Sequence, residues 1–403
     1  SPAATTVKPP PPTIADLVLL LQSYKPDAER IARLRSGMEE SVPETVDSGL
    51  LAVAWHRKAL AAGELQELER RGEFLERALE HARAAKEVRG NILGSYARVR
   101  TEYADNLSAT KGVTFALDSY TEFTAEYEKR PPIGLLIHAH CQMAGYYVHL
   151  GDVERAKVSL SKAEAIFKHL ATRRQAARNL PSWSKKIETT RGLILRREGR
   201  LEEEELALLA ALRQAEEQVE TLDALREDGK WTPPVSRAEA GADARRVTLA
   251  QTLMAQARLD EAELMLRDVL KTSLARDGRN SPLVGHTLSV LQGVFSDRGR
   301  YAEALVLAEW ADKTLAEAGL SERSPPRLYS RIGLANAFGT VGRHTEAAIL
   351  IDSFRDKLKD DTRLEEGFAQ GTLGSIRTFI AVGRVADALR DGENLLAKAT
   401  RHY

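Results

Sequence analysis

The residues of this chain that could perform chemistry lie close together at His138, His140 and Cys141. A cysteine and a histidine can act as a nucleophile and its general base. His138 and Cys141 are three residues apart, which places both on one face of a helix. They also lie inside a helix of the repeat described below, where packing and ligand contacts are the usual roles. We favour those roles over the alternatives of catalysis and metal binding.

Other signatures of catalysis do not occur in the sequence. There is no GxxxxGK[ST] phosphate loop, GxGxxG dinucleotide turn, HExxH zinc motif or GxSxG nucleophile elbow. Cys141 is the single cysteine, so an intramolecular disulfide and a cysteine-based zinc site are excluded. We therefore predict no catalytic residue, no metal site, no cofactor and no enzymatic activity.

The charge balance excludes another class of function. Lys and Arg together number 58, as do Asp and Glu, so the net charge is zero. Proteins that bind nucleic acid by neutralising phosphates carry a surplus of basic residues, so we expect no nucleic-acid partner. The apolar run at residues 17–21 is far too short to span a bilayer, and we expect no membrane insertion.

A short turn recurs along the chain and must position any functional side chain. It consists of a small residue, often followed by Arg or Asp, with Ala five positions later. The last copies are separated by 42, 43 and 41 residues, a regularity that indicates an internal repeat. The copies start at Gly151, Gly299, Gly342 and Gly383, with variants at Gly112, Gly199 and Ala257.

Helical patterns flank each turn. Apolar residues recur at helical spacing on both sides, as at Leu288 and Leu291 before Gly299 and at Ala304 and Leu307 after it. Glycine at the junction supplies the left-handed backbone that ends the first helix. Each unit is therefore an antiparallel helix pair. A single pair cannot bury its own apolar face, so neighbouring pairs must stack into an all-α solenoid.

This unit resembles the tetratricopeptide repeat (TPR) family. The family motif has a small residue at position 8, an aromatic at 11, Gly at 15 and Ala at 20. Two copies match at Ala144, Tyr147, Gly151 and Ala156, and at Ala335, Phe338, Gly342 and Ala347. The resemblance implies a right-handed α-solenoid, here with a period of about 42 in place of the family's 34 residues, as in long-helix bacterial variants.

The predicted organisation has three parts. Residues 1–13 are expected to be a disordered, Pro-rich lead. Residues 14–89 are expected to form a helical cap and a degenerate first repeat. Residues 90–403 are expected to form the TPR-like solenoid, with an inserted loop near 223–243.

The resemblance also implies the position of a binding site. In TPR proteins the first helix of each pair lines a concave groove and contacts a protein or peptide ligand. The family's carboxylate clamp needs Lys at position 5 and Asn at position 9; Asn336 fits but Ile332 does not, so the clamp is not predicted. Residues expected to line the groove are His138, Cys141, Lys186, Arg196, Gln251, His286, Ser289, Tyr329, Asn336 and Arg377.

The two ends of the sequence carry further expectations. The Pro-rich start lacks an initiator Met, which favours an exported or periplasmic bacterial protein over a cytoplasmic one. The last repeat is not followed by the polar-faced helix that usually ends such arrays. Residues 13–17 (TIADL) and 24–27 (YKPD) also resemble the starts of exported TPR arrays that precede a CHAT (caspase-like) domain. We therefore expect a longer multidomain protein, with control of an attached protease as the alternative function.

Overall fold

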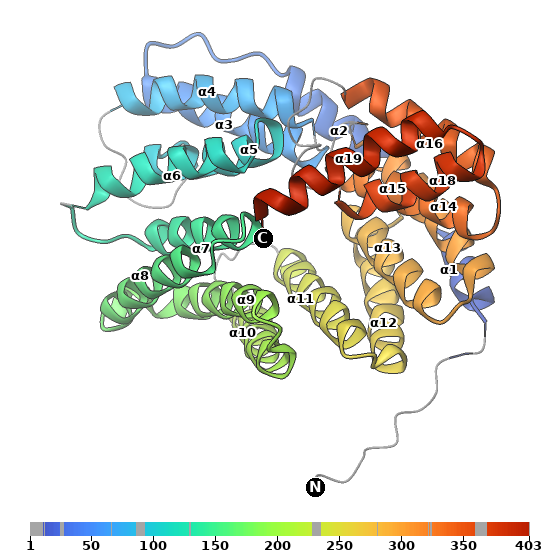
Figure 1. The fold of residues 1–403 in the computed structure, drawn as a ribbon. Helices are drawn as coiled ribbons and strands as arrows, with labels where there is room; N and C mark the ends of the chain where they lie inside the picture. The colour runs from blue at the N-terminus through green and yellow to red at the C-terminus, as the bar shows by residue number, and fades with distance from the viewer. Residues whose placement is uncertain are drawn as a thin grey trace, which may run out of the picture.

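The computed structural model describes residues 11, 13–24, 28–65, 67–85, 93–128, 130–227, 235–279, 281–320, 322, 325–358 and 369–402. Within these ranges the chain folds into α-helices and one 3₁₀ helix, without a strand. The helices follow one another around the middle of the molecule (Figure 1). The predicted all-α solenoid is confirmed.

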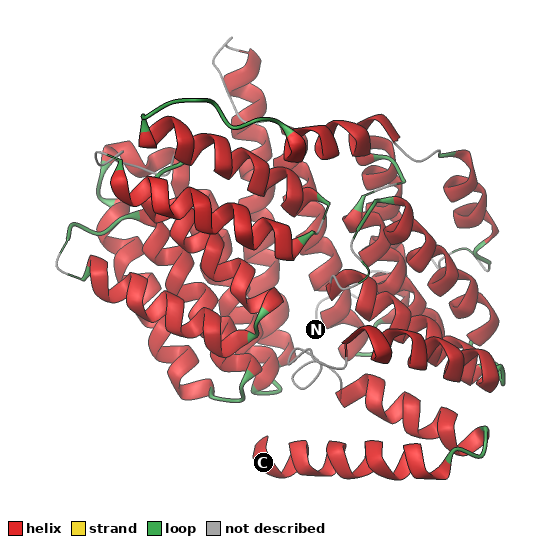
Figure 2. Ribbon diagram, turned by 90° about the horizontal axis from the view of Figure 1, so that it is seen from above, coloured by secondary structure: helices red, strands yellow, loops and turns green. Residues whose placement is uncertain are grey.

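Consecutive helices pack as antiparallel pairs, as Figure 2 shows from a second direction. The pairs are α3 (Ser48–Glu64) with α4 (Leu68–Ala84), α5 (Tyr96–Thr110) with α6 (Val113–Tyr127), α7 (Gly134–His149) with α8 (Val153–Ala171), α9 (Leu180–Arg197) with α10 (Leu201–Glu227), α11 (Val235–Ala255) with α12 (Leu259–Asp277), α13 (Pro282–Asp297) with α14 (Tyr301–Glu317), α15 (Pro325–Thr340) with α16 (His344–Leu358), and α18 (Ala369–Ala381) with α19 (Val385–His402). The 3₁₀ helix η1 (Arg174–Asn179) precedes α9.

The predicted turns adopt the left-handed backbone that the sequence pattern indicates. In every one of these turns except that of Gly112, the amide after the left-handed residue donates to a carbonyl of the last helical turn, as from Arg300 to Phe295 at 2.9 Å. This bond satisfies a carbonyl that the end of the helix would leave free. The φ values are 107° at Gly112, 82° at Gly151, 73° at Gly199, 60° at Ala257, 73° at Gly299, 84° at Gly342 and 78° at Gly383.

The arginine that follows the glycine has a structural role in joining the two helices of a pair. The guanidinium of Arg343 lies 4.3 Å from the ring centroid of Phe338 on the preceding helix. It also binds Glu346, three residues further on, in the first turn of the next helix. Arg384 repeats the arrangement over Phe379 at 4.4 Å. The guanidinium therefore bridges an aromatic face and a carboxylate across the turn.

The first helices of the pairs contact one another and form the inner wall of the solenoid. Direct packing joins α5 to α7, α7 to α9, α11 to α13, α13 to α15, and α15 to α18. In Figure 1, α7, α9 and α11 lie nearer the middle of the molecule than α8, α10 and α12. Helices α9 and α11 are joined by side chains, including a 3.0 Å hydrogen bond from Arg196 to Thr252.

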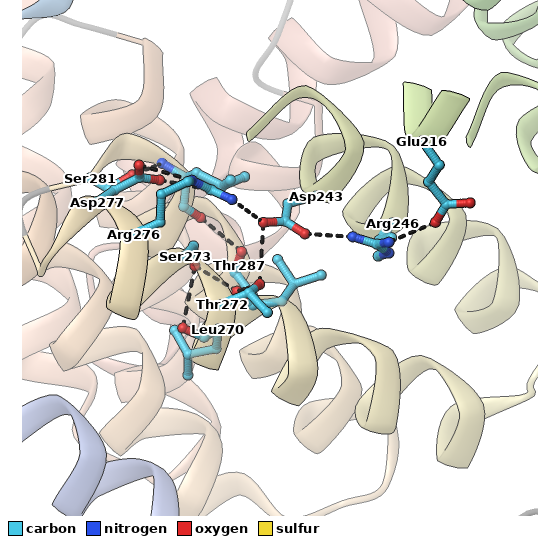
Figure 3. A network of polar contacts seen from close by, with 12 residues as sticks. Glu216, Asp243, Arg246, Leu270, Thr272, Ser273, Arg276, Asp277, Ser281 and Thr287 are labelled. Carbon is cyan, nitrogen blue, oxygen red and sulfur yellow. Dashed lines mark hydrogen bonds and ion pairs between the residues drawn. The ribbon is translucent and has the colours of Figure 1, made fainter. Parts of the chain in front are cut away.

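A buried carboxylate fixes α11 to its neighbours α10 and α12 (Figure 3). Asp243 on α11 is only 2% exposed. It accepts hydrogen bonds from Arg246 at 2.8 Å, from Arg276 at 2.7 Å and from Thr272 at 3.2 Å. Arg246 continues the network to Glu216 on α10 at 2.6 Å. Two cations and a hydroxyl thus compensate the cost of burying this charge.

The first helix packs against helices far from it in sequence. Helix α1 (Ala15–Ser23) precedes α2 (Ala28–Glu39) and α3 within the segment expected to form the cap and first repeat. Its fully buried Leu17 and Leu21 belong to the same core as residues of α12, α13 and α14. Asp16 forms two 2.9 Å hydrogen bonds with Arg267 of α12. The run of leucines makes α1 apolar on several faces, so it is buried in an existing core.

The predicted lead and insert are only partly described. Residues 1–10 and 12 of the lead lie outside the described ranges. Of the insert expected near 223–243, residues 223–227 continue α10 and residues 235–243 begin α11. Residues 228–234 lie outside the description. Helix therefore covers more of this interval than predicted, because strong helix formers extend α10 to Glu227.

Candidate functional site

A cluster of polar side chains joins three successive first helices around Asp105 of α5. The Asp105 carboxylate accepts hydrogen bonds from Tyr120 at 2.6 Å, from Gln142 at 2.8 Å and from Nε2 of His138 at 2.9 Å. Lys186 of α9 contacts Nδ1 of His138. The cluster therefore brings together His138 and Lys186, two of the predicted groove residues.

The hydrogen bonds fix the tautomer of His138. An ammonium group has only donors, so Nδ1 of His138 accepts from Lys186 and Nε2 carries the proton that Asp105 accepts. The imidazole of His138 is thus hydrogen-bonded to a lysine on α9 and to a carboxylate on α5. This arrangement holds the ring in one orientation on the inner wall.

Burial dominates the protonation behaviour of the cluster. It raises the pKa of Asp105 and raises the pKa of Tyr120 well above its usual value, because both charged forms are poorly solvated. Burial also lowers the pKa of Lys186 to about 8, although the charge of Asp105 acts in the opposite direction. Keeping Lys186 charged at this position of the inner wall therefore costs free energy.

Cys141 and His138 do not form a catalytic pair. Cys141 is 2% exposed and packs in a core with Leu160 and Ile187, whereas His138 faces the polar cluster. Burial raises the pKa of the Cys141 thiol to about 12, which opposes formation of the nucleophilic thiolate. Burial lowers the pKa of the neighbouring His140 to about 4. Cys141 is inaccessible to a ligand at this exposure.

The predicted residues on α9, α11 and α13 are distributed along the inner wall. Arg196 binds Glu204 at 2.7 Å and Thr252 at 3.0 Å, so it connects α9 to α10 and α11. Gln251 is half-buried and His286 is exposed. Ser289 is half-buried and donates to the carbonyl of Gly285 at 3.1 Å. Of these side chains, His286 is the most open to a ligand.

The predicted residues on α15 and α18 differ in availability. Tyr329 is 58% exposed, and Arg377 is also exposed. Asn336 instead packs against α18, where a Cβ at Gly374 would lie 1.8 Å from its side-chain oxygen. Asn336 therefore fills a close approach between two helices, while Tyr329 and Arg377 are free to contact a ligand.

Sequence reasoning missed three charged residues of the inner wall. Asp105 occupies the motif position at which Ala144 and Ala335 stand in the matched repeats. A charged residue at a position for small residues is a signal that could have identified it. Lys185 lies next to the predicted groove residue Lys186, and only the structure shows that burial, together with the charge of Arg245 on α11, lowers its pKa.

The described ranges contain neither a metal cluster nor a membrane span. Within them, no three His, Cys, Asp or Glu side chains are grouped so as to hold a metal ion. No described helix is both long and apolar enough to cross a membrane.

Comparison with known proteins identifies the fold. No protein-family model and no curated protein matches this chain. A crystal structure of Rap protein complexed with Competence and Sporulation Factor matches with a TM-score of 0.61 at 13% identity, over 96% of each chain. The Rap conjugation gene regulator of the plasmid pLS20, in complex with the Phr* peptide, matches with a TM-score of 0.50 at 14% identity, over 88% of this chain and 97% of that one. These likenesses confirm a TPR-like solenoid.

Proposed function

We propose that this chain is a non-enzymatic scaffold or sensor that binds a peptide, or a peptide-like segment of a protein, in a groove along its inner wall. The observation that carries this proposal is the exposure of large side chains on the first helices, above all Tyr329 at 58%. A tyrosine exposed on the inner wall offers a large amphipathic surface to a ligand.

The comparisons support the choice of ligand. Both solenoids described above match this chain over most of their length, and their structures contain a factor or a peptide. Parallel first helices present side chains at regular intervals along one wall, which suits an extended or helical peptide. Which peptide is bound depends on the side chains of the groove, which can vary without changing the fold.

The chemistry of the described residues supports the absence of catalysis in this proposal. The Cys141 thiol is buried with a raised pKa, and His138 is engaged between Asp105 and Lys186. A general base needs to reach the proton of a bound reactant. The hydrogen bonds of His138 serve instead to connect three helices.

Peptide selection can test the proposal. A displayed library of random peptides is selected on the wild-type chain, and each enriched peptide is measured against Tyr329→Ala combined with Arg377→Ala. Loss of an aromatic and a cationic contact is expected to weaken binding about 10-fold or more. Tyr301→Ala is the matched control, because Tyr301 is a 45% exposed tyrosine at the start of the outer helix α14.

Two results would contradict the proposal. One is that no peptide is enriched on a chain whose far-ultraviolet circular dichroism shows the expected helix content. The other is that the control variant weakens binding as much as the double variant, which would place the ligand outside the inner wall.

The expected C-terminal CHAT domain, its regulation by this array and export to the periplasm stay predictions. Each concerns sequence or location outside the described fold. The gene's complete coding sequence would test all of them, because a caspase-like domain or a signal peptide is recognisable there.

A further inference from the structure

Helix α1 shows how this array holds a helix in a groove away from its inner wall (Figure 1). Helices α12 and α14 both pack on α13. Helix α1 lies in the core that these three helices share, with Leu17 and Leu21 fully buried. Asp16 of α1 also binds Arg267 of α12 at 2.9 Å. Two buried leucines one turn apart and an ion pair thus seat α1 between second helices of the repeat.

A groove of the same kind lies between α4 and α6. Both helices pack on α5, and the three helices line an open hollow of about 470 Å³. Its apolar lining includes Leu79 of α4, Leu107 of α5 and Phe115 of α6. The two leucines are buried, whereas Phe115 is 53% exposed. A docked helix would cover the Phe115 ring, as α1 covers the apolar residues of α12 and α14.

Both walls of this α4–α6 groove carry acidic residues. Glu76 and Glu80 stand four residues apart on α4, and Asp118 and Glu122 stand four residues apart on α6. The side chains of Glu80 and Glu122 are 65% and 74% exposed. Like charges at this spacing destabilise an isolated helix. Helix stability therefore does not account for either pair.

The arginines of the lining do not cancel this charge. Arg100 is 7% exposed and binds Glu122 at 2.6 Å, so it neutralises one carboxylate. Arg83 lies over the ring of Tyr96, 5.8 Å from the centroid. With four carboxylates and two arginines in its lining, the α4–α6 groove carries a net negative charge.

One equivalent position in the two grooves has opposite charge. Glu76 and Arg267 are each the ninth residue of their helix, on α4 and α12. Arg267 binds the acidic Asp16 of α1, so Glu76 favours a basic residue at the same place. Glu76 accepts a hydrogen bond from the neutral Tyr103 at 2.7 Å, which leaves its charge in place. Helix α1 of a second copy is a poor occupant, because its Asp16 would face a carboxylate.

We propose that the α4–α6 groove binds a basic amphipathic helix of a partner protein. The helix lays an apolar stripe over Phe115 and places Lys or Arg, one turn apart, beside the carboxylates of both walls. The negative groove repels nucleic acid and anionic lipid, which favours a protein as the partner. This surface goes beyond the peptide ligand proposed for the inner wall.

Selection of helical peptides can test this proposal. A library of helix-forming peptides, randomised on one face, is selected on the wild-type chain. Each round removes peptides that also bind Glu80→Lys combined with Asp118→Lys, which reverses one exposed charge on each wall. We expect the enriched peptides to carry Lys or Arg beside an apolar stripe. Their binding should weaken about 10-fold or more in the double variant and in Phe115→Ala.

Two control variants match these changes on other second helices. Glu154→Lys combined with Glu217→Lys alters the net charge equally, at exposed positions of α8 and α10. Leu206→Ala removes a 66% exposed apolar side chain from α10. Both controls should bind the enriched peptides as the wild-type chain does. Tyr329→Ala combined with Arg377→Ala should also bind them normally, because those residues lie on the inner wall.

Photo-cross-linking locates the bound peptide. A photoreactive leucine in its apolar stripe is expected to attach to α4, α5 or α6, which mass spectrometry of the digested chain identifies. The proposal is overturned if no peptide survives the counter-selection, if the charge control weakens binding as much as the groove variant, or if the cross-links lie elsewhere. Failure of the inner-wall proposal leaves all of these results unchanged, so the two proposals can fail separately.

Discussion

At the scale of single residues, the junction of α3 and α5 depends on a buried histidine and a carboxylate. His56 is fully buried and accepts a hydrogen bond at Nδ1 from the amide of Gly94. Its Nε2 therefore carries the proton and donates to Glu102 at 3.0 Å. Burial alone would raise the pKa of Glu102, but His56 and Arg98 outweigh it and lower this pKa to about 2.

This lowered pKa predicts a loss of stability in acid. Because Glu102 binds its proton more weakly in the folded chain, its contribution is complete above the usual glutamate pKa of 4.5 and is lost as pH falls from 4.5 to about 2. The full effect is about 3 kcal/mol. Urea unfolding of Glu102→Gln should show lower stability than wild type at pH 7 and a smaller difference at pH 3. A constant difference across this range would contradict the assignment.

At the scale of elements, the turn between paired helices is the part of the fold that is most readable from sequence. The glycine, the following arginine and the aromatic before it are all local, and the structure uses them together, as in Phe338, Gly342 and Arg343. The helix pairs could be predicted as well, because the spacing of apolar residues that defines each helix is also a local property of the sequence. Residues 223–227, which were expected in an inserted loop, instead continue α10, because this stretch is rich in strong helix formers.

One turn carries a residue that is poorly suited to its backbone. Ala257 has a φ of 60°, a conformation that places its Cβ close to the following carbonyl. We expect Ala257→Gly to raise the free energy of unfolding by about 1 kcal/mol. The reverse change at the equivalent turn, Gly299→Ala, should lower it by a similar amount. Urea unfolding at pH 7 measures both, and destabilisation by Ala257→Gly would show that the methyl group is needed for packing.

At the scale of the whole molecule, the N-terminal helices are tied to helices that lie far along the sequence. Helix α1 is buried against α12, α13 and α14, and Ile31 and Leu65 lie close to Gly319 after α14. Arg267, 5% exposed, anchors Asp16 across 251 residues of sequence. Sequence periodicity could not predict this closure, because it reports contacts between neighbouring repeats and not between distant ones.

The same argument explains which part of the candidate site was predictable. His138 and Lys186 were found because they occupy groove positions of matched repeats. Arg245 was missed because the direction of its side chain depends on how α11 is rotated, which the Asp243 network sets through α10 and α12. Rotation of one helix against another is a property of packing and not of local pattern.

The closure predicts that α1 supports helices far from it in sequence. Leu21→Ala should cost about 3 kcal/mol, because Leu21 is fully buried in the core of α12–α14. Leu19→Ala, in the same helix but 67% exposed, should change stability by less than about 0.5 kcal/mol. Hydrogen exchange should accelerate in α12–α14 only in Leu21→Ala. Faster exchange confined to α1 would show that α1 does not stabilise the distant helices.

The contact between α1 and α12 also limits how this protein can evolve. An open helical array gains or loses hairpins readily, because each hairpin touches only its neighbours. Here an added or deleted hairpin between α2 and α12 would move Arg267 away from Asp16 and expose the buried leucines of α1 to water. The contact between α1 and α12 can therefore form only with a fixed number of hairpins between them, as a cyclic oligomer closes only with a fixed number of subunits. Duplication and loss of repeats should be rare among its descendants.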